Sequence, residues 1–327
     1  MSKIRKSAAG KRGTGIRSDC YIELKLKRTG GIKIKLESKV KPMYGESIKR
    51  TIMVMSKHLD VKNADILIED YGALPPTLMA RYELAVKRTQ PSSDKEYLPS
   101  FNKKNKYSTT KERLRRSRLY LPGNEPKFFP NAGLHQPDAI ILDLEDSVSP
   151  SEKDSAQILV RNVLRTINFY GAERMVRINQ LPRGLQDLEY IIPNNVHVIL
   201  IPKCESKENI LAVHDEVTKL KAKFRVKNDI YYMPIIESAL GVENAYEIAS
   251  ASEYNCALAV GLEDYTADIG AERTFEGSES FYARTAIVNA AKAAGIQAID
   301  TVFSDVANME GLRQRGLEAK GLGFEGK

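Results

Sequence analysis

Short apolar runs that alternate with helical stretches dominate the chain from residue 116 onward. Apolar strands separated by helices form a parallel sheet that is buried on both faces. The seven runs are 118–121, 139–144, 175–178, 196–201, 231–236, 257–260 and 296–299. Their spacing leaves room for one helix after each strand, which predicts a (β/α) TIM barrel more than an open sheet. No Gly-x-Gly-x-x-Gly follows any of these runs, which argues against a dinucleotide-binding fold.

The first 89 residues follow a different pattern, which predicts a small α+β unit. Residues 21–26 and 32–36 alternate apolar with charged positions around a Gly-containing turn, as expected of a β-hairpin with one buried face. The elements expected next are a helix at 44–59, a strand at 64–68 and a second helix opened by Pro75 and Pro76.

Residues 90–115 are polar and contain few apolar side chains. Such a composition buries too little apolar surface to offset chain entropy, so we expect a mobile, solvated linker. The predicted organisation is a small α+β unit at 1–89, a linker at 90–115 and a barrel domain at 116–327.

The composition indicates in which cellular compartment we expect the protein. No apolar stretch approaches the roughly 18–20 residues of a membrane-spanning helix, so we expect no membrane association. The basic opening from Met1 to Arg17 has no apolar core after it and is not a secretory signal. Cys20, Cys204 and Cys256 show no paired or metal-type spacing, which favours a reducing cytoplasm.

Charge is distributed unevenly along the chain. Residues 1–115 hold 27 Lys and Arg against 12 Asp and Glu, a balance of +15, whereas the remainder carries a balance of −7. The contrast predicts two units with different roles. A basic unit suits nucleic acid or the phosphates of a coenzyme. Because the predicted hairpin lacks the aromatic platform of a single-strand binder, we expect no nucleic-acid partner.

Polar residues follow the predicted barrel strands, at the end where barrel enzymes place their active sites. They are Asp143, Glu145, Asp146, Arg177, Asn179, Lys203, Glu205, Glu237, Glu263, Asp264 and Asp300. Carboxylates gathered at one opening repel one another unless a cation lies between them. Oxygen ligands without a histidine cluster favour Mg²⁺, with Glu237 and Asp264 as its expected ligands.

Several of these residues have simpler interpretations. Asp146 can cap the helix that follows it, and Glu145 is better explained by an ion pair with Arg177 than by metal ligation. Lys203 is a conceivable Schiff-base nucleophile, but we expect it to pair with the neighbouring Glu205.

Six segments together resemble the citrate lyase β subunit, within the wider HpcH/HpaI aldolase superfamily. They are Arg116-Ser-Arg-Leu-Tyr-Leu-Pro-Gly-Asn124, Ile141-Leu-Asp-Leu-Glu-Asp-Ser-Val148, Val176-Arg-Ile-Asn179, Ile201-Pro-Lys-Cys-Glu-Ser206, Ile236-Glu-Ser-Ala-Leu-Gly241 and Gly261-Leu-Glu-Asp264. The resemblance implies a Mg²⁺-dependent lyase that cleaves a citryl thioester to oxaloacetate and an acetyl thioester. The implied residues are Glu237 and Asp264 on the metal, Arg177, Glu237 and Glu145 in catalysis, and Arg177, Glu237 and Arg116 on the substrate. The general base is not identified.

The N-terminal unit resembles the citrate lyase γ subunit, a small acyl carrier protein. The matching segments are Gly13-Thr-Gly-Ile-Arg-Ser-Asp19, Val40-Lys-Pro-Met-Tyr-Gly-Glu-Ser-Ile48, Asp70-Tyr-Gly-Ala-Leu74 and Ala80-Arg-Tyr-Glu83. That family carries a phosphoribosyl-dephospho-CoA arm on a serine, and the ungapped alignment puts Arg17 at this position. Either Ser18 takes the arm after a shift of one residue, or the carrier is not charged in the usual way.

A second departure lies at the end of the chain. The family continues with an Ile-His-Pro strand, whereas this sequence stops at Lys327, so we expect a barrel without its eighth strand and with an unsatisfied edge. The open alternatives are that another copy supplies this strand, that the chain is a truncated product, or that the barrel is incomplete and weakly active. The resemblance further implies a citrate lyase α subunit (CoA-transferase) as partner and a homo-oligomer. The alternatives are a lyase of the malyl-CoA type with a vestigial carrier unit, a non-catalytic scaffold and a nucleic-acid-binding module joined to a barrel.

Overall fold

A computed structural model describes residues 6–305 and 307–327, so the first five residues of the basic opening lie outside it. The chain forms two compact units that interleave along the sequence. Unit 1 comprises residues 1–105, 122–131 and 147–168, and unit 2 comprises residues 106–121, 132–146 and 169–327. The division expected at 89 and 116 stays a prediction.

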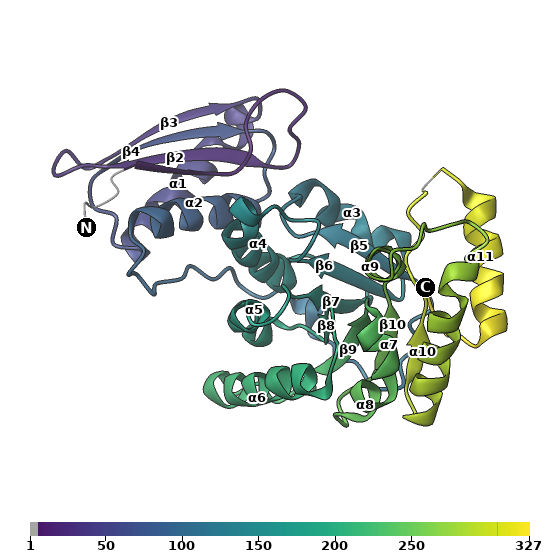
Figure 1. Ribbon diagram of the computed structural model, residues 1–327. Helices are drawn as coiled ribbons and strands as arrows, with labels where there is room; N and C mark the ends of the chain where they lie inside the picture. Colours follow the sequence, from purple (N-terminus) through teal and green to yellow (C-terminus); the bar gives the residue numbers. More distant parts are fainter. Residues whose placement is uncertain (1–5, 306) are drawn as a thin grey trace. The chain divides into compact units, whose positions relative to one another are not determined.

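Unit 1 is built on a four-stranded sheet in the order β1-β2-β4-β3, with helices α1 and α2 on one face (Figure 1). Its elements are β1 (Lys6–Ala9), β2 (Cys20–Leu26), β3 (Ile32–Ser38), α1 (Lys41–His58), β4 (Ala64–Asp70) and α2 (Pro75–Thr89). Alternate residues of β4, such as Ile66 and Ile68, are buried beside Ile52 and Met55 of α1 in the apolar core.

The predicted hairpin is wrong, although both of its strands are present. Strand β4 lies between β2 and β3, pairing antiparallel with β2 and parallel with β3. Parallel neighbours need a crossover connection, and the 18-residue helix α1 supplies it. Strand β1, which the sequence analysis did not predict, pairs antiparallel with the other edge of β2.

Unit 2 contains a curled, parallel, seven-stranded sheet in the order β11-β10-β9-β8-β7-β6-β5 (Figure 1). All seven predicted strands are confirmed, each to within two residues at either end, as β5 (Arg118–Pro122), β6 (Ala139–Asp143), β7 (Glu173–Arg177), β8 (Val198–Ile201), β9 (Tyr231–Ile236), β10 (Ala257–Val260) and β11 (Gln297–Ile299). Side chains such as Ile141, Met175, Leu200 and Met233 form one buried cluster in the sheet.

Helices follow most of these strands, which makes the fold an α/β fold. They are α3 (Phe129–Ala132), α4 (Lys153–Thr166), α5 (Gly184–Ile191), α6 (Lys207–Phe224), α7 (Ala239–Glu243), α8 (Ala245–Ser250), α9 (Leu262–Asp268), α10 (Phe281–Ala293) and α11 (Met309–Leu322). Helix α4 belongs to unit 1, where the buried ion pair between Arg161 and Glu83 joins it to α2 at 2.7 Å.

Residues 325–327 extend the hydrogen bonding of the parallel sheet. The Glu325 N–H donates to the Ala298 carbonyl, and the Asp300 N–H donates to the Gly326 carbonyl, each at 2.8 Å. The Lys327 N–H donates to the Arg116 carbonyl, just before β5, at 3.1 Å. The edge of β11 was expected to be unsatisfied, and this part of the expectation is wrong.

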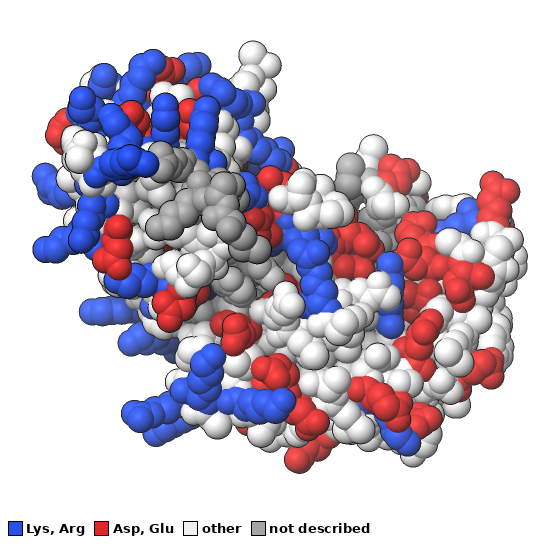
Figure 2. All heavy atoms as spheres, turned by 60° about the vertical axis from the view of Figure 1, so that its left-hand side comes forward, with Lys and Arg blue, Asp and Glu red and all other residues white. Residues whose placement is uncertain are grey.

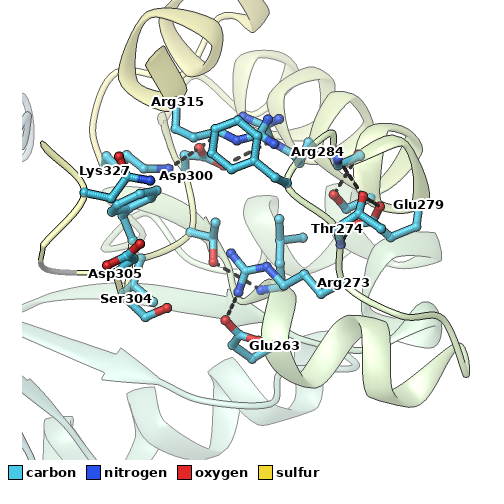
Figure 3. A pocket seen from close by; sticks show the side chains of 18 residues that line it. Glu263, Arg273, Thr274, Glu279, Arg284, Asp300, Ser304, Asp305, Arg315 and Lys327 are labelled. Atoms are coloured by element: carbon cyan, nitrogen blue, oxygen red, sulfur yellow. Dashed lines mark hydrogen bonds and ion pairs between the residues drawn. The ribbon is translucent and has the colours of Figure 1, made fainter. Parts of the chain in front are cut away.

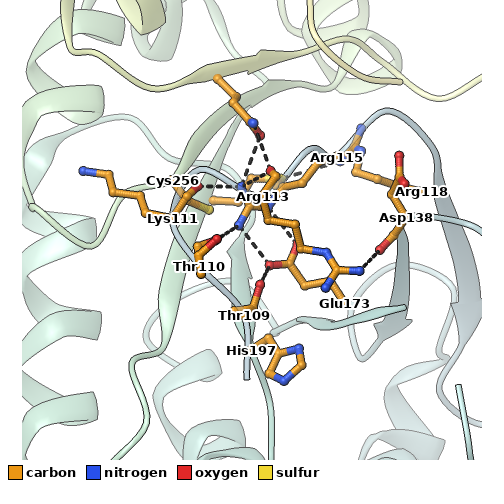
Figure 4. Close-up of polar contacts among 12 residues, drawn as sticks. Thr109, Thr110, Lys111, Arg113, Arg115, Arg118, Asp138, Glu173, His197 and Cys256 are labelled. Atoms are coloured by element: carbon orange, nitrogen blue, oxygen red, sulfur yellow. Dashed lines mark hydrogen bonds and ion pairs between the residues drawn. The ribbon is translucent and has the colours of Figure 1, made fainter. Parts of the chain in front are cut away.

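The segment 90–115 is not the solvated tether that its composition predicts. Asn105 and Arg115 are both buried. Asn105 donates to the Ile167 carbonyl within unit 1. In unit 2, Arg115 donates from two nitrogens to Glu173 at 2.8 and 2.9 Å and from a third to Gln297 at 3.1 Å (Figure 4). Because Glu173 and Gln297 begin β7 and β11, Arg115 ties together the amino ends of strands that are not neighbours.

Charged side chains are distributed differently over the two units. Figure 2 shows Lys and Arg gathered over the four-stranded sheet, where Lys25, Lys33 and Lys35 are exposed. Within the described residues, no helix combines the length and the apolar character that crossing a membrane requires. Cys20, Cys204 and Cys256 are buried, and each carries a free thiol.

The Arg115–Glu173 pair should be a main determinant of unit 2 stability. Replacing one partner of a fully buried pair leaves the other charge uncompensated, so Arg115→Met should lower the free energy of unfolding by about 3–5 kcal/mol. The matched control is Arg116→Met, because the exposed Arg116 pairs with Asp138 at the surface. Calorimetric melting of both variants checks this; equal melting temperatures would contradict it.

Candidate active site

The carboxyl ends of five neighbouring strands bring together most of the predicted site residues of unit 2. Glu145 follows β6, Arg177 ends β7, Lys203 follows β8, Glu237 follows β9 and Asp264 follows β10. Ion pairs connect the side chains of Glu145, Arg177, Lys203 and Asp264, and the backbone N–H of Lys203 donates to Glu237. The expectation that these residues meet at one opening of the sheet therefore agrees with the structure.

Arg177 is held by two carboxylates from the strand beside it. Its Nε and Nη2 donate to the two oxygens of the buried Asp143, both at 2.7 Å, and its Nη1 lies 2.8 Å from Glu145 Oε2. The expected Glu145–Arg177 pair is present. Asp143 was not assigned as the main partner, although it faces Arg177 directly in the register of β6 and β7. Asp146 remains exposed, with its nearest carboxylate oxygen 3.9 Å from Arg177.

Lys203 faces the site rather than Glu205, which corrects the expected pairing. Its Nζ lies 3.7 Å from Glu145 Oε1 and 3.5 Å from Asp264 Oδ2. Burial opposes the charge of the ammonium, but the surrounding carboxylates outweigh it and raise the pKa of Lys203. A Schiff-base nucleophile requires a neutral amine, so this environment disfavours that role.

Glu237 is the most enclosed of the expected metal ligands. Only 7% of the residue is exposed, and its Oε2 accepts the Lys203 N–H at 2.9 Å. Gly261 allows β10 to approach it, since a Cβ at that position would stand 2.4 Å from Glu237 Oε1. The Glu237 carboxylate occupies the space that a side chain at position 261 would need, which explains why the segment 261–264 begins with glycine.

Burial and like charge change the protonation of two site carboxylates. Burial, helped by repulsion from Glu145 and Asp264, raises the pKa of Glu237 from 4.5 to about 7, although the Lys203 N–H opposes this shift. Burial together with the charge of Asp146 likewise raises the pKa of Glu145 to about 7, although Arg177 and Lys203 lower it. Both groups can therefore exchange protons near neutral pH.

Tyr120 is a further member of the site that the sequence analysis did not single out. It stands on β5, and the Arg177 guanidinium lies 5.4 Å from the centre of its ring. Burial raises the pKa of the Tyr120 hydroxyl, although Arg118 and Arg177 act against this. An aromatic residue in a strand usually belongs to the core, so the sequence offered no distinguishing signal.

The donor set suits Mg²⁺ held with help from water or substrate. No group of three or more His, Cys, Asp or Glu arranged for a metal occurs among the described residues. Mg²⁺ is commonly bound through one or two carboxylates, with waters and substrate oxygens completing its shell. Glu237 and Asp264, whose carboxylates repel each other, fit that requirement.

Two predicted residues lie elsewhere. Arg116 precedes β5, at the amino end of the strands, and pairs with Asp138 at 2.8 Å, so the structure does not bring it to the site. Ser18 belongs to unit 1, where it adopts a left-handed conformation with φ of 57° and donates its N–H to the Tyr71 carbonyl at 3.0 Å. Ser18 is partly exposed.

A cavity of about 350 Å³ opens in unit 2 beside Glu263 (Figure 3). Its basic residues are already paired with carboxylates, for example Arg284 and Lys327 with Asp300, and Arg273 with Glu263. Glu237, Arg177 and Lys203 do not line it. The cavity therefore adjoins the candidate active site without containing its main groups.

Comparison with family models matches both parts of the chain. Residues 116–327 match the HpcH/HpaI aldolase/citrate lyase family. Residues 8–89 match the family of the malonate decarboxylase δ subunit, labelled as acyl carrier proteins.

Relatives of known function share this similarity. The chain is 41% identical over 219 residues to the citrate lyase β subunit of Leuconostoc mesenteroides subsp. cremoris, covering 66% of this chain and 72% of that protein. It is 32% identical over 226 residues to human mitochondrial citramalyl-CoA lyase, covering 65% and 66%. The crystallised citrate lyase β subunit of M. tuberculosis with oxaloacetate and magnesium has a TM-score of 0.54 at 27% identity, covering 66% of this chain and 92% of that one.

The raised pKa of Glu237 should make stability depend on pH when metal is chelated. Its folded-state pKa of about 7 exceeds its ordinary value of 4.5, so the folded state binds the extra proton and loses stability as pH rises from about 4.5 to 7. At pH 8 the ionisation of Glu237 lowers the free energy of unfolding by about 3 kcal/mol, and Glu237→Gln should abolish this loss. Calorimetry should show the variant melting roughly 5–10 °C higher at pH 8 and no higher at pH 4.

The matched control is Glu205→Gln, which removes an exposed carboxylate that follows the neighbouring strand. It should melt as the wild type at both pH values. A Glu237→Gln variant with the same pH dependence as the wild type would contradict this assignment.

Proposed function

The chain belongs to the HpcH/HpaI aldolase/citrate lyase family, and from this premise we propose that it cleaves a citryl thioester to oxaloacetate and an acetyl thioester with the help of Mg²⁺. Membership makes it a carbon–carbon lyase. The observation that supports the substrate and metal most directly is that Lys203 contacts Glu237 through its N–H and Asp264 through its Nζ, while Glu145, which also faces Lys203, pairs with Arg177. These are the groups that a cation and an anionic substrate would need.

The proposed reaction is a retro-Claisen cleavage. The C3 hydroxyl of the citryl group loses its proton and becomes the ketone of oxaloacetate. The bond between C2 and C3 breaks, and its electron pair forms the enolate of the acetyl thioester, which then takes up a proton. When bound by Glu237 and Asp264, Mg²⁺ would supply the positive charge that orients and polarises the substrate oxygens.

The residues of the chain supply the remaining functions. Arg177 is fixed by Asp143, so a substrate carboxylate would approach its Nη1, which now faces Glu145. Glu145, with a pKa of about 7, is the group that we assign to proton transfer with the C3 hydroxyl. Lys203 adds positive charge beside Glu145, with its Nζ 3.7 Å from Glu145 Oε1.

We further propose that the curled sheet is a (β/α) TIM barrel in which residues 325–327 hold the eighth strand position. Their hydrogen bonds to β11 on one side and to Arg116 on the other support this assignment. An active site at the carboxyl ends of the strands is the general arrangement of this architecture.

The N-terminal unit is proposed to be an acyl carrier domain over residues 1–89, joined through 90–115 to the lyase domain at 116–327. The match of residues 8–89 to a carrier family supports it. Ser18 would bear a phosphoribosyl-dephospho-CoA arm, and its neighbours Ile16 and Arg17 line a cavity of about 620 Å³. A tethered carrier would deliver its thioester at an effective concentration on the order of millimolar.

A lyase for free CoA thioesters is the second candidate. It is favoured by Arg17, which occupies the position where the carrier family has its modified serine. The similarity to citramalyl-CoA lyase is compatible with such a substrate. In the leading proposal, by contrast, the chain would work in the cytoplasm as a homo-oligomer with a citrate lyase α subunit (CoA-transferase).

The metal assignment can be tested with two adjacent residues. Asp264→Asn should lower oxaloacetate release from citryl-CoA by at least about 100-fold, as should chelation of the wild type, because one ligand of the cation is lost. Glu263→Gln is the matched control, since Glu263 is exposed and pairs with Arg273. Equal rates of oxaloacetate release in the wild type, Asp264→Asn and the chelated enzyme would contradict the proposal of a Mg²⁺-dependent lyase.

The carrier assignment makes a separate prediction. Protein purified from its native source should have an intact mass raised by the arm, and Ser18→Ala should lack this increase, because no other residue would accept the arm. Thr14→Ala, four residues away, should retain it. An unmodified wild type that still turns over free citryl-CoA would favour the second candidate.

A further inference from the structure

Lys203 contacts the site through both its backbone and its side chain. Its N–H donates to Glu237 Oε2 at 2.9 Å, while its Nζ lies 3.5 Å from Asp264 Oδ2 and 3.7 Å from Glu145 Oε1. One residue thus touches both expected metal ligands and the carboxylate assigned to proton transfer. Each of these carboxylates comes from a different strand end.

The backbone of Lys203 is held in a conformation that lysine rarely adopts. Its φ is 51°, in the left-handed region where a Cβ is disfavoured. Neighbouring contacts stabilise this turn. The Cys204 N–H donates to the Ile235 carbonyl at 3.1 Å, and Gly241 packs so closely that a Cβ there would lie 2.6 Å from the Cys204 carbonyl. Strained backbone of this kind persists where the surroundings over-determine it.

We infer that Lys203 is a positioning residue that competes with the divalent cation for Asp264 while its backbone holds Glu237 in place. This inference rests on the proposed function, because it concerns the same metal. An ammonium and a divalent cation repel each other, so each weakens the attraction of the Asp264 carboxylate for the other. When a cation binds, the Lys203 ammonium has a second partner in Glu145, 3.7 Å away.

The geometry gives Lys203 room for this exchange. About 31% of its side chain is exposed, and Asp264 is exposed to 43%, so the contact between them can open without disturbing the core. Glu145 and Glu237, in contrast, are buried. The competition therefore affects Asp264, whereas Glu237 keeps its fixed hydrogen bond from the Lys203 backbone.

The side-chain function is tested by direct metal binding at pH 8.5, where Glu145 and Glu237 are ionised. Titration of the full chain with Mn²⁺, followed by electron paramagnetic resonance and by competition with Mg²⁺, gives the dissociation constant. Lys203→Met should bind Mn²⁺ about 5–10-fold more tightly, because a competing positive charge is lost. The matched control Lys207→Met, whose lysine pairs with Glu247, should change the constant less than about twofold.

The backbone function is tested at the same position. Lys203→Gly retains the left-handed conformation without strain and should bind as tightly as Lys203→Met. Lys203→Val also removes the charge, but valine is β-branched and disfavoured at positive φ. It should bind Mn²⁺ more weakly than Lys203→Met, because the N–H that donates to Glu237 moves. Lys203→Arg should restore an affinity close to the wild type.

Two failures can be distinguished. If the wild type binds Mn²⁺ no more tightly than Asp264→Asn, the proposed metal site is wrong. If Asp264→Asn weakens binding but Lys203→Met binds as the wild type or more weakly, the metal site stands and the competition by Lys203 is refuted. Damage to the fold would weaken binding, so tighter binding cannot arise from a merely structural role.

Discussion

The candidate active site depends on an imbalance of charge at one edge of the parallel sheet. Asp143, Glu145, Asp146, Glu237 and Asp264 gather there, and the cations that lie within 4 Å of carboxylates of this group are Arg177 and Lys203. When all of these groups are ionised, five carboxylates face two cations, and a bound divalent cation would neutralise part of the negative excess. Burial raises the pKa values of Glu145 and Glu237, and repulsion among these carboxylates adds to the shift.

Keeping this surplus in place requires backbone features that would otherwise be unfavourable. Gly261 leaves the space that Glu237 occupies, and Gly241 allows α7 to pack against the turn at Lys203 and Cys204. Ser238 begins α7 by accepting the Gly241 N–H at 3.1 Å. The segments 201–206, 236–241 and 261–264 therefore pack as one unit around Glu237, whose carboxylate accepts the Lys203 N–H and faces Gly261.

Patterns of neighbouring residues in the sequence predicted those features of the fold that depend on neighbouring residues alone. The seven strands of unit 2 followed from apolar runs, and the clustering of Glu145, Glu237 and Asp264 followed from the rule that parallel strands end at one edge. The hairpin failed because strand pairing is a tertiary choice, which the helix crossover to β4 decided. The partners of Lys203 were missed because Glu145 and Asp264 follow other strands, and sequence neighbours do not reveal a contact between strand ends.

A second buried charge cluster contrasts with the one at the candidate active site. At the amino ends of the strands, Arg115 and Glu173 are fully enclosed, and backbone carbonyls and Gln297 satisfy the remaining donors of Arg115. One positive charge meets one negative charge, so this cluster needs nothing from outside and contributes to stability. The cluster at the carboxyl ends uses the same residue types but leaves them unbalanced and partly accessible. The difference between structural and chemical ends of this sheet therefore lies in whether the chain neutralises its own charges.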